Sequence, residues 1–148
     1  MLVNPVPEDR QTALGLLAHD VQDLSVVSFV LQDAIVTVFD MVYLEKEATF
    51  ALAVNRFRWE DSETVTPGER VHAGLRFDRV NKVQYRQINR SDPDRFISLL
   101  SIAYDAGVVV LHFAGGAAIR LEVDGLLCAL KDLDVPWPTI WRPEHNPD

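Results

Sequence analysis

The segment Gly107–Asp134 reads GVVVLHFAGGAAIRLEVDGLLCALKDLD. Two alternating apolar runs flank Gly115-Gly116 and predict a β-hairpin, because glycine adopts the positive φ angles that tight turns require. Behind the hairpin, apolar side chains recur at helical spacing and predict a short amphipathic helix over Leu126, Leu127, Leu130 and Leu133. The passage from hairpin to helix is the strongest indication of fold in the chain.

The order of side chains along the hairpin constrains its register. Apolar residues alternate with polar ones before the turn (Val109, Leu111, Phe113) and after it (Ile119, Leu121, Val123). Opposed residues of a ladder share one face, so we expect Phe113 opposite Ile119 and Leu111 opposite Leu121. The alternating pattern therefore requires a loop of three or five residues, or a bulge. The expected register also places His112 opposite Arg120 on the outer face.

The segments before the hairpin alternate between strand and turn signals. A first strand is expected near Leu14–Leu17, and a helix over residues 21–32 behind an Asp20 N-cap. In the run from Phe50 to Trp59 the apolar positions change parity, which predicts either a bulge near Asn55 or a strand that is apolar on both faces. Further strands are expected around residues 35–43, 71–86 and 96–102.

These elements predict an α+β fold. Strands in hairpin succession, with a helix near each end, indicate a strongly bent antiparallel sheet or split barrel. The outline resembles pleckstrin-homology-like barrels, with the final helix covering one open end. At 148 residues the chain is expected to be a single domain, with a loose lead-in at residues 1–11 and an extended tail rich in proline and tryptophan at residues 135–148.

Composition restricts the classes of partner. The chain carries a net charge of −8, yet residues 70–95 hold 7 basic and 3 acidic side chains, a basic strip within an acidic protein. The single cysteine, Cys128, excludes an internal disulfide, and no signal peptide or membrane-spanning run is visible, so a cytoplasmic location is expected. The charge makes nucleic acid an unfavoured partner.

No catalytic or cofactor motif stands out in the sequence. The four histidines are far apart and show no metal-ligand spacing, so no metal site and no cofactor are expected. Cys128 reads as a small buried hydrophobe rather than a nucleophile. Gly115-Gly116 is followed by no Lys-Ser or Lys-Thr pair and reads as a turn rather than a phosphate loop.

Arginine interleaved with aromatic residues is the one suggestive theme. Arginines lie on or beside expected strands, next to Phe57, Trp59, Phe77 and Tyr85, at Arg56, Arg58, Arg76, Arg79, Arg86 and Arg120. Such a face can bind a phosphorylated small ligand, an acidic peptide or single-stranded nucleic acid. The alternative is a solvated face whose arginines pair with Asp78, Glu60 and Glu122.

The segments NRFRWE (55–60), GLRFDRV (74–80) and FAGGAAIRLEV (113–123) resemble a small bacterial family of uncharacterised proteins, a domain of unknown function. The likeness runs from about Leu14 to Arg142. It implies a bacterial cytoplasmic protein and assigns no activity, ligand or catalytic residue.

Three functional hypotheses result. The first is a non-catalytic binding or interaction module, with Arg56, Arg58, Trp59, Arg76, His112 and Arg120 as candidate ligand-binding residues. The second is a small enzyme with a site assembled around His112 and Arg120. The third is a weak nucleic-acid binder using the 70–95 strip. A homodimer through a sheet edge or the Trp137/Trp141 tail is also compatible with the sequence.

Overall fold

The computed structural model describes residues 15–57 and 70–133. In this part of the chain it contains one α-helix, α1 (Val21–Val30). The strands are β1 (Gly15–Ala18), β2 (Ile35–Thr37), β3 (Met41–Leu44), β4 (Thr49–Phe57), β5 (Arg70–Phe77), β6 (Val80–Arg86), β7 (Phe96–Asp105), β8 (Val108–Phe113), β9 (Ala118–Val123) and β10 (Cys128–Asp132). No helix in the described ranges is long and apolar enough to cross a membrane.

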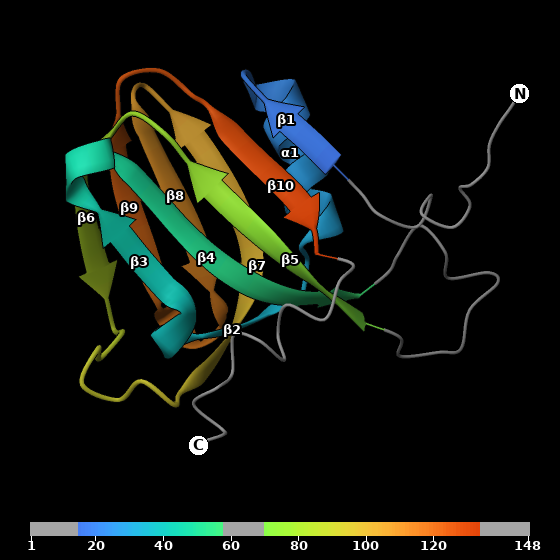
Figure 1. Cartoon of the computed structure of the whole chain (residues 1–148), viewed down its shortest axis with the longest axis vertical. Coiled ribbons are helices and arrows are strands. Elements are labelled where there is room, and N and C mark those ends of the chain that lie inside the picture. The colour runs from blue at the N-terminus through green and yellow to red at the C-terminus, as the bar shows by residue number, and fades with distance from the viewer. Residues whose placement is uncertain (1–14, 58–69, 134–148) are drawn as a thin grey trace, which may run out of the picture.

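All strand pairs are antiparallel, and the strands form one open sheet in the order β1-β10-β5-β4-β2-β7-β8-β9-β6, with β3 paired to β4. The sheet folds over on itself into two layers (Figure 1). One layer holds β1, β10, β5, β4 and β3, and the other holds β7, β8, β9 and β6. Strand β2 joins the layers because it pairs with both β4 and β7.

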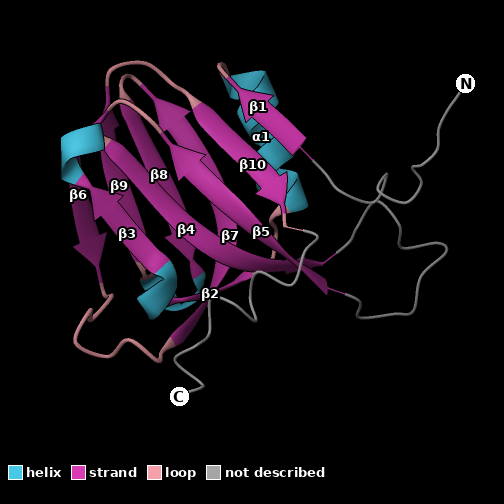
Figure 2. Ribbon diagram, in the orientation of Figure 1, coloured by secondary structure: helices cyan, strands magenta, loops and turns pink. Residues whose placement is uncertain are grey.

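Residues from both layers form a single apolar core. Phe50 on β4 and Phe77 on β5 are buried in the same cluster as Leu111 and Ile119 of the other layer. Helix α1 packs against β1 and β7 and adds Leu24 and Val27 to this core. The secondary-structure colouring in Figure 2 shows how small the helical share of the molecule is.

Local signals account for the position of α1. The Asp20 side chain caps the helix by accepting a hydrogen bond of 2.8 Å from the Asp23 backbone N–H. The backbone N–H of Ile102 donates to the Ser28 hydroxyl at 3.0 Å, which ties the helix to β7 beside the bulge between Leu99 and Ser101. The helix lies within the range expected from the sequence.

The expected α+β architecture with two terminal helices is wrong. The segment after the hairpin is strand β10, which pairs with β1 on one side and β5 on the other. Cys128, Leu130 and Asp132 are buried and alternate with the less buried Ala129 and Lys131, so the period here is two residues rather than 3.6. The backbone hydrogen bonds that this segment makes with two flanking strands outweigh the local preference for helix that the spacing of the leucines indicates. The comparison with pleckstrin-homology-like barrels, which relied on a final helix, fails with it.

The expected bulge near Asn55 is also absent. Strand β4 pairs with β5 in unbroken register from Phe50↔Phe77 to Phe57↔Arg70. The inward parity set by Phe50, Leu52 and Val54 therefore continues to Arg56, which is buried. The other alternative, a strand with apolar residues on both faces, describes β4, because Phe57 lies on the opposite face.

The hairpin β8–β9 has the expected faces and a different register. A backbone hydrogen bond of 2.9 Å from Phe113 N to Ala117 O closes a three-residue turn over 114–116, in which Gly115 and Gly116 have φ of 79° and 84°. An odd loop was expected. The pairs are Leu111↔Ile119 and His112↔Ala118 rather than those expected, because parity fixes the face and leaves three- and five-residue loops equally acceptable.

Candidate functional site

The outer face of β8, β9 and β6 presents a regular grid of side chains. Cross-strand pairing places His112, Ala118 and Arg86 in one row. The next row holds Val110, Arg120 and Gln84. The third row holds Val108, Glu122 and Lys82. His112 and Arg120 thus share a face, as expected, although they are diagonal neighbours rather than a directly opposed pair.

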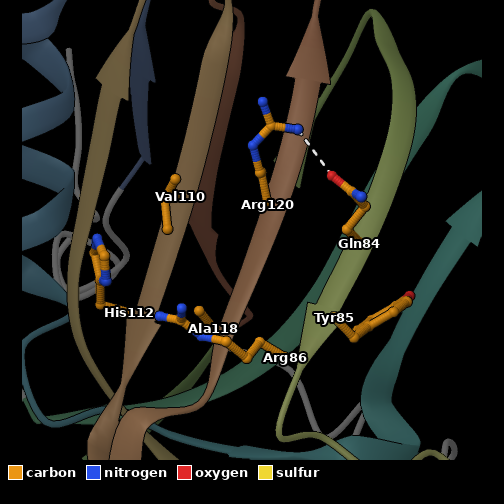
Figure 3. Close-up of a pocket in the computed structure, with 7 residues that line it drawn as sticks. All are labelled: Gln84, Tyr85, Arg86, Val110, His112, Ala118 and Arg120. Atoms are coloured by element: carbon orange, nitrogen blue, oxygen red, sulfur yellow. Dashed lines mark hydrogen bonds between the residues drawn. The ribbon is translucent and has the colours of Figure 1, made fainter.

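The first two rows line a surface pocket of about 410 Å³. Its lining residues are Gln84, Tyr85, Arg86, Val110, His112, Ala118 and Arg120 (Figure 3). Ala118 forms the floor, because its side chain is the smallest between two larger neighbours. Strands lie about 4.8 Å apart, so the Cα atoms of His112 and Arg86 flank Ala118 at a separation of about 10 Å. Figure 3 shows the Arg86 side chain reaching across β9 toward His112.

Hydrogen bonds hold one of the two arginines and leave the other open. Arg120 Nη1 donates to Gln84 Oε1 at 2.8 Å and to Glu122 Oε2 at 2.7 Å, which orients the guanidinium. The hydrogen bond from Arg120 lowers the pKa of Glu122, so the pair stays charged at neutral pH. Arg86 and His112 are exposed, and their side chains make no hydrogen bond or ion pair within the described ranges. Their donors face a pocket that no carboxylate lines.

Tyr85 marks one edge of the pocket and belongs mainly to the core. Its ring meets Phe50 edge-on at 6.5 Å, and the Arg90 guanidinium lies 4.4 Å from the ring centroid. Burial raises the pKa of the Tyr85 hydroxyl, and the Arg90 charge partly opposes this. In Figure 3 the ring points away from the four polar side chains. Tyr85 therefore supports the wall of the pocket rather than its polar centre.

Arg56, a candidate ligand-binding residue, lies in the interior. Its Nε and Nη2 donate to the two carboxylate oxygens of Asp132 at 2.9 and 2.8 Å, and its Nη1 donates to the Phe57 carbonyl at 2.8 Å. The two side chains are 0% and 1% exposed. This two-point pairing matches the fork of a guanidinium to a carboxylate and compensates the cost of burying both charges. Arg56 is a structural residue that joins β4 to β10.

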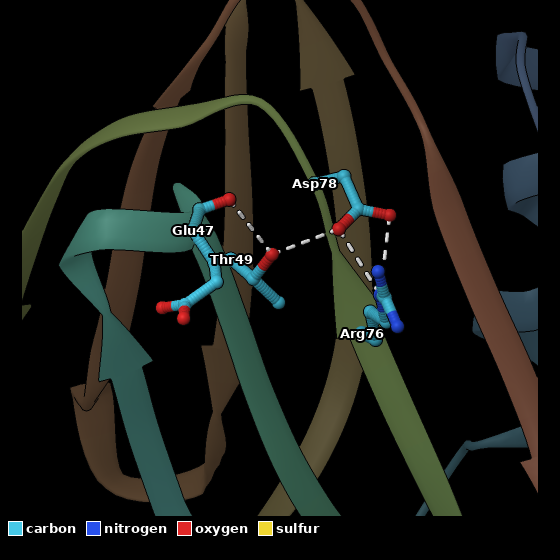
Figure 4. Close-up of polar contacts among 4 residues, drawn as sticks. All are labelled: Glu47, Thr49, Arg76 and Asp78. Carbon is cyan, nitrogen blue, oxygen red and sulfur yellow. Dashed lines mark hydrogen bonds and ion pairs between the residues drawn. The ribbon is translucent and has the colours of Figure 1, made fainter.

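Arg76 lies at the end of β5, far along the sheet from β9. Its Nε donates to both oxygens of Asp78 at 3.0 and 3.2 Å. Thr49 Oγ1 lies 2.9 Å from Asp78 Oδ1 and 3.1 Å from the Glu47 carbonyl, so the carboxylate links three segments (Figure 4). This contact fixes the short connection from β5 to β6, where the chain passes from one layer to the other.

The candidate arginines therefore do not share one exposed surface. Arg56 is buried, and Arg76 and Arg120 are exposed on separate strands, each paired with a carboxylate two residues further along. Arg58 and Trp59 lie outside the described residues. The basic strip is divided as well: Arg70 stacks on Phe57 with its guanidinium carbon 3.9 Å from the ring centroid, on the β4–β5 ladder, whereas Lys82 and Arg86 lie on β6.

The remaining reactive groups in the described part of the chain show no catalytic arrangement. Cys128 is buried, and burial first, then the charge of Asp78, raises the pKa of its thiol to about 12. In residues 15–57 and 70–133, no three histidine, cysteine, aspartate or glutamate side chains are grouped so that they could hold a metal ion. None of the described residues gives the His112 side chain the hydrogen bond that would orient an imidazole as a general base.

Two of the candidate ligand-binding residues, His112 and Arg120, line the pocket. Arg86 and Tyr85 were named in the arginine and aromatic pattern without being listed as candidates, and nothing in the sequence selects Gln84, Val110 or Ala118. The alternation of Lys82, Gln84 and Arg86 with apolar residues was visible as a basic outer face. The place of this face beside Arg120 depends on pairing between β6 and β9, which are separated along the chain by β7 and β8. Nothing in the local sequence marks Ala118 as a pocket residue, because it forms the floor only through the larger side chains that flank it on β6 and β8.

Fold and site together define a class: an all-antiparallel two-layer β protein with a cationic pocket on the outer face of one layer. The chain belongs to the DUF2948 family, described as proteins of unknown function, whose model matches residues 14–145. This match confirms the resemblance to a domain of unknown function. Comparison with curated proteins and with solved structures gives no match.

Proposed function

We propose that this chain is a non-catalytic binding module, and that its pocket on β6, β9 and β8 holds the anionic group of a small phosphorylated ligand. The observation that carries the proposal is the arrangement around Ala118. The side chains of Arg86 and His112, which make no hydrogen bond or ion pair within the described residues, line the pocket together with Ala118 and Arg120, and no carboxylate lines it. Arginine forks are suited to phosphate oxygens.

Local charge supports an anionic ligand despite the acidic chain. Lys82, Arg86 and Arg120 on β6 and β9 face the single carboxylate Glu122, whereas the whole chain carries −8. An anion is therefore repelled by much of the protein and attracted at this place. The pocket volume of about 410 Å³ lies in the range of small-molecule sites, which favours a phosphorylated small ligand over an acidic peptide.

The geometry favours binding over the two other hypotheses. Catalysis around His112 and Arg120 would need a group that orients the imidazole, and none of the described residues supplies it. Nucleic-acid binding would need a continuous basic track, and the basic residues of 70–95 are divided between β5, β6 and the segments that flank β6. The setting of the module in the bacterial cytoplasm is part of the proposal and rests on the resemblance and the single cysteine.

The test is phosphate titration followed by amide chemical shifts. Inorganic phosphate should shift the amides of His112, Ala118 and Arg120. Arg86→Gln should weaken binding about tenfold or more, because a hydrogen bond to a charged group contributes about 1.5–3 kcal/mol. Arg76→Gln removes an exposed arginine of another strand and is the matched control. Absence of shifts at the pocket, or equal weakening by both variants, would refute the proposal.

A further inference from the structure

The outer face continues beyond the charged pocket onto β7. Ala103 pairs with Val110, and Asp105 pairs with Val108. Ala103 is exposed, and Val108 and Val110 are half-buried. These three apolar side chains form a small patch on β7 and β8 next to the pocket residues Arg86, His112 and Arg120. We call it the apolar shelf: Ala103, Val108 and Val110.

The distance between shelf and floor suits one small ligand. Ala118 lies diagonally across from Val110, because Val110 pairs with Arg120 and His112 pairs with Ala118. Diagonal neighbours in an antiparallel pair lie about 7–8 Å apart. A phosphate above Ala118 would thus place the group that it carries between His112 and Arg120, with one face on Val110.

The side chains that border this path favour a flat group. The His112 imidazole and the Arg120 guanidinium are both planar, and planar guanidinium and imidazole groups stack on aromatic rings. Hydrogen bonds to Gln84 and Glu122 already orient the Arg120 guanidinium, so an aromatic ring can stack on it with little further loss of side-chain entropy. Asp105 bounds the far end of the shelf and disfavours a second anionic group there.

We infer that the ligand is an organic phosphate monoester with an aromatic group, bound with its phosphate above Ala118 and its ring on the apolar shelf. This inference rests on the proposed function and specifies its ligand class. It makes Val110 a specificity residue. Arg86 and Ala118 contact only the phosphate, so their contribution to binding does not depend on the group that the phosphate carries.

Two probes of equal charge separate ring binding from phosphate binding. Phenyl phosphate and methyl phosphate are titrated by calorimetry into the full chain, the Val110→Thr variant and the Arg86→Gln variant. Phenyl phosphate should bind about eightfold more tightly than methyl phosphate, the gain from burying roughly 50 Å² of ring surface at ~25 cal/mol/Å². Val110→Thr keeps the shape of the side chain and should remove most of this difference, with methyl phosphate unchanged.

The outcomes are distinct. Equal binding of both probes, lost in Arg86→Gln, would overturn the aromatic ligand and leave the anion-binding module standing. Binding of neither probe would overturn both. An Ala118→Leu variant, which fills the floor and keeps every charge, should abolish binding of both probes. Should it fail to fold, Arg86→Gln decides the question, because Arg86 is exposed.

Discussion

The ion pair between Arg56 and Asp132 offers the sharpest test of the fold. Substituting Asp132→Asn keeps the size of the side chain and leaves the Arg56 charge buried without its counter-charge. Two charge-assisted hydrogen bonds of 2.9 and 2.8 Å are weakened at side chains only 0% and 1% exposed. Breaking a buried pair in this way costs about 3–5 kcal/mol. A domain of this size has a free energy of unfolding of about 5–15 kcal/mol, so the loss is a large part of the total.

Urea unfolding measures this loss. With an m-value of about 2 kcal/mol/M, Asp132→Asn should lower the unfolding midpoint by about 2 M. Arg76→Gln removes an exposed pair and should cost no more than about 1 kcal/mol. The double variant Arg56→Met/Asp132→Leu should regain much of the stability, because two apolar side chains of similar length can fill the same space. A midpoint shift for Asp132→Asn no larger than that for Arg76→Gln would refute the buried pairing of β4 with β10.

Three smaller perturbations test other parts of the structure. Cys128 should resist thiol reagents in the native state and react on unfolding. Because the pKa of its thiol rises from 9.0 to about 12 on folding, the free energy of unfolding should fall between pH 9 and 12 by up to about 1.4 kcal/mol per pH unit. The Cys128→Ala variant should show a smaller decline in urea titrations. Gly115→Ala and Gly116→Ala should each destabilise in thermal melts, because both glycines have positive φ, which L side chains rarely adopt; an unchanged melting temperature in both variants would contradict the turn geometry. Asp20→Ala should cost about 0.5–2 kcal/mol through the lost N-cap, whereas Asp20→Ser should cost little.

The sequence predicted those parts of the fold that depend on residues close together along the chain. The β8–β9 hairpin, its inner face and the helix behind Asp20 follow from alternation, glycine and capping, which act within a few residues. The helix expected at Leu126–Leu133 does not form, because this segment pairs as β10 with β1 and β5, which lie more than fifty residues away in the sequence. Tertiary pairing of this kind overrides a short periodic signal.

The candidate site divides in the same way. His112 and Arg120 were placed on one face by the parity of a single hairpin. Arg56 was a candidate ligand-binding residue because it lies beside aromatic residues on an expected strand, although it shares the parity of the inward-facing Phe50. Its partner Asp132 lay in a segment expected to be helical. Arg86 joins the pocket only through pairing of β6 with β9, which no local signal specifies.

The place of β10 in the sheet has a consequence for how the chain acquires its structure. Gly15 pairs with Lys131, and β5 pairs with β10 across fifty residues or more, so much of the sheet closes through very distant contacts. Such topologies fold slowly, in milliseconds to seconds, because long loops must close before their contacts stabilise them. During synthesis, β1 and one edge of β5 must wait until residue 132 has left the ribosome. Until then the nascent chain carries open strand edges and an Arg56 without its carboxylate, the features that make a growing polypeptide depend on chaperones.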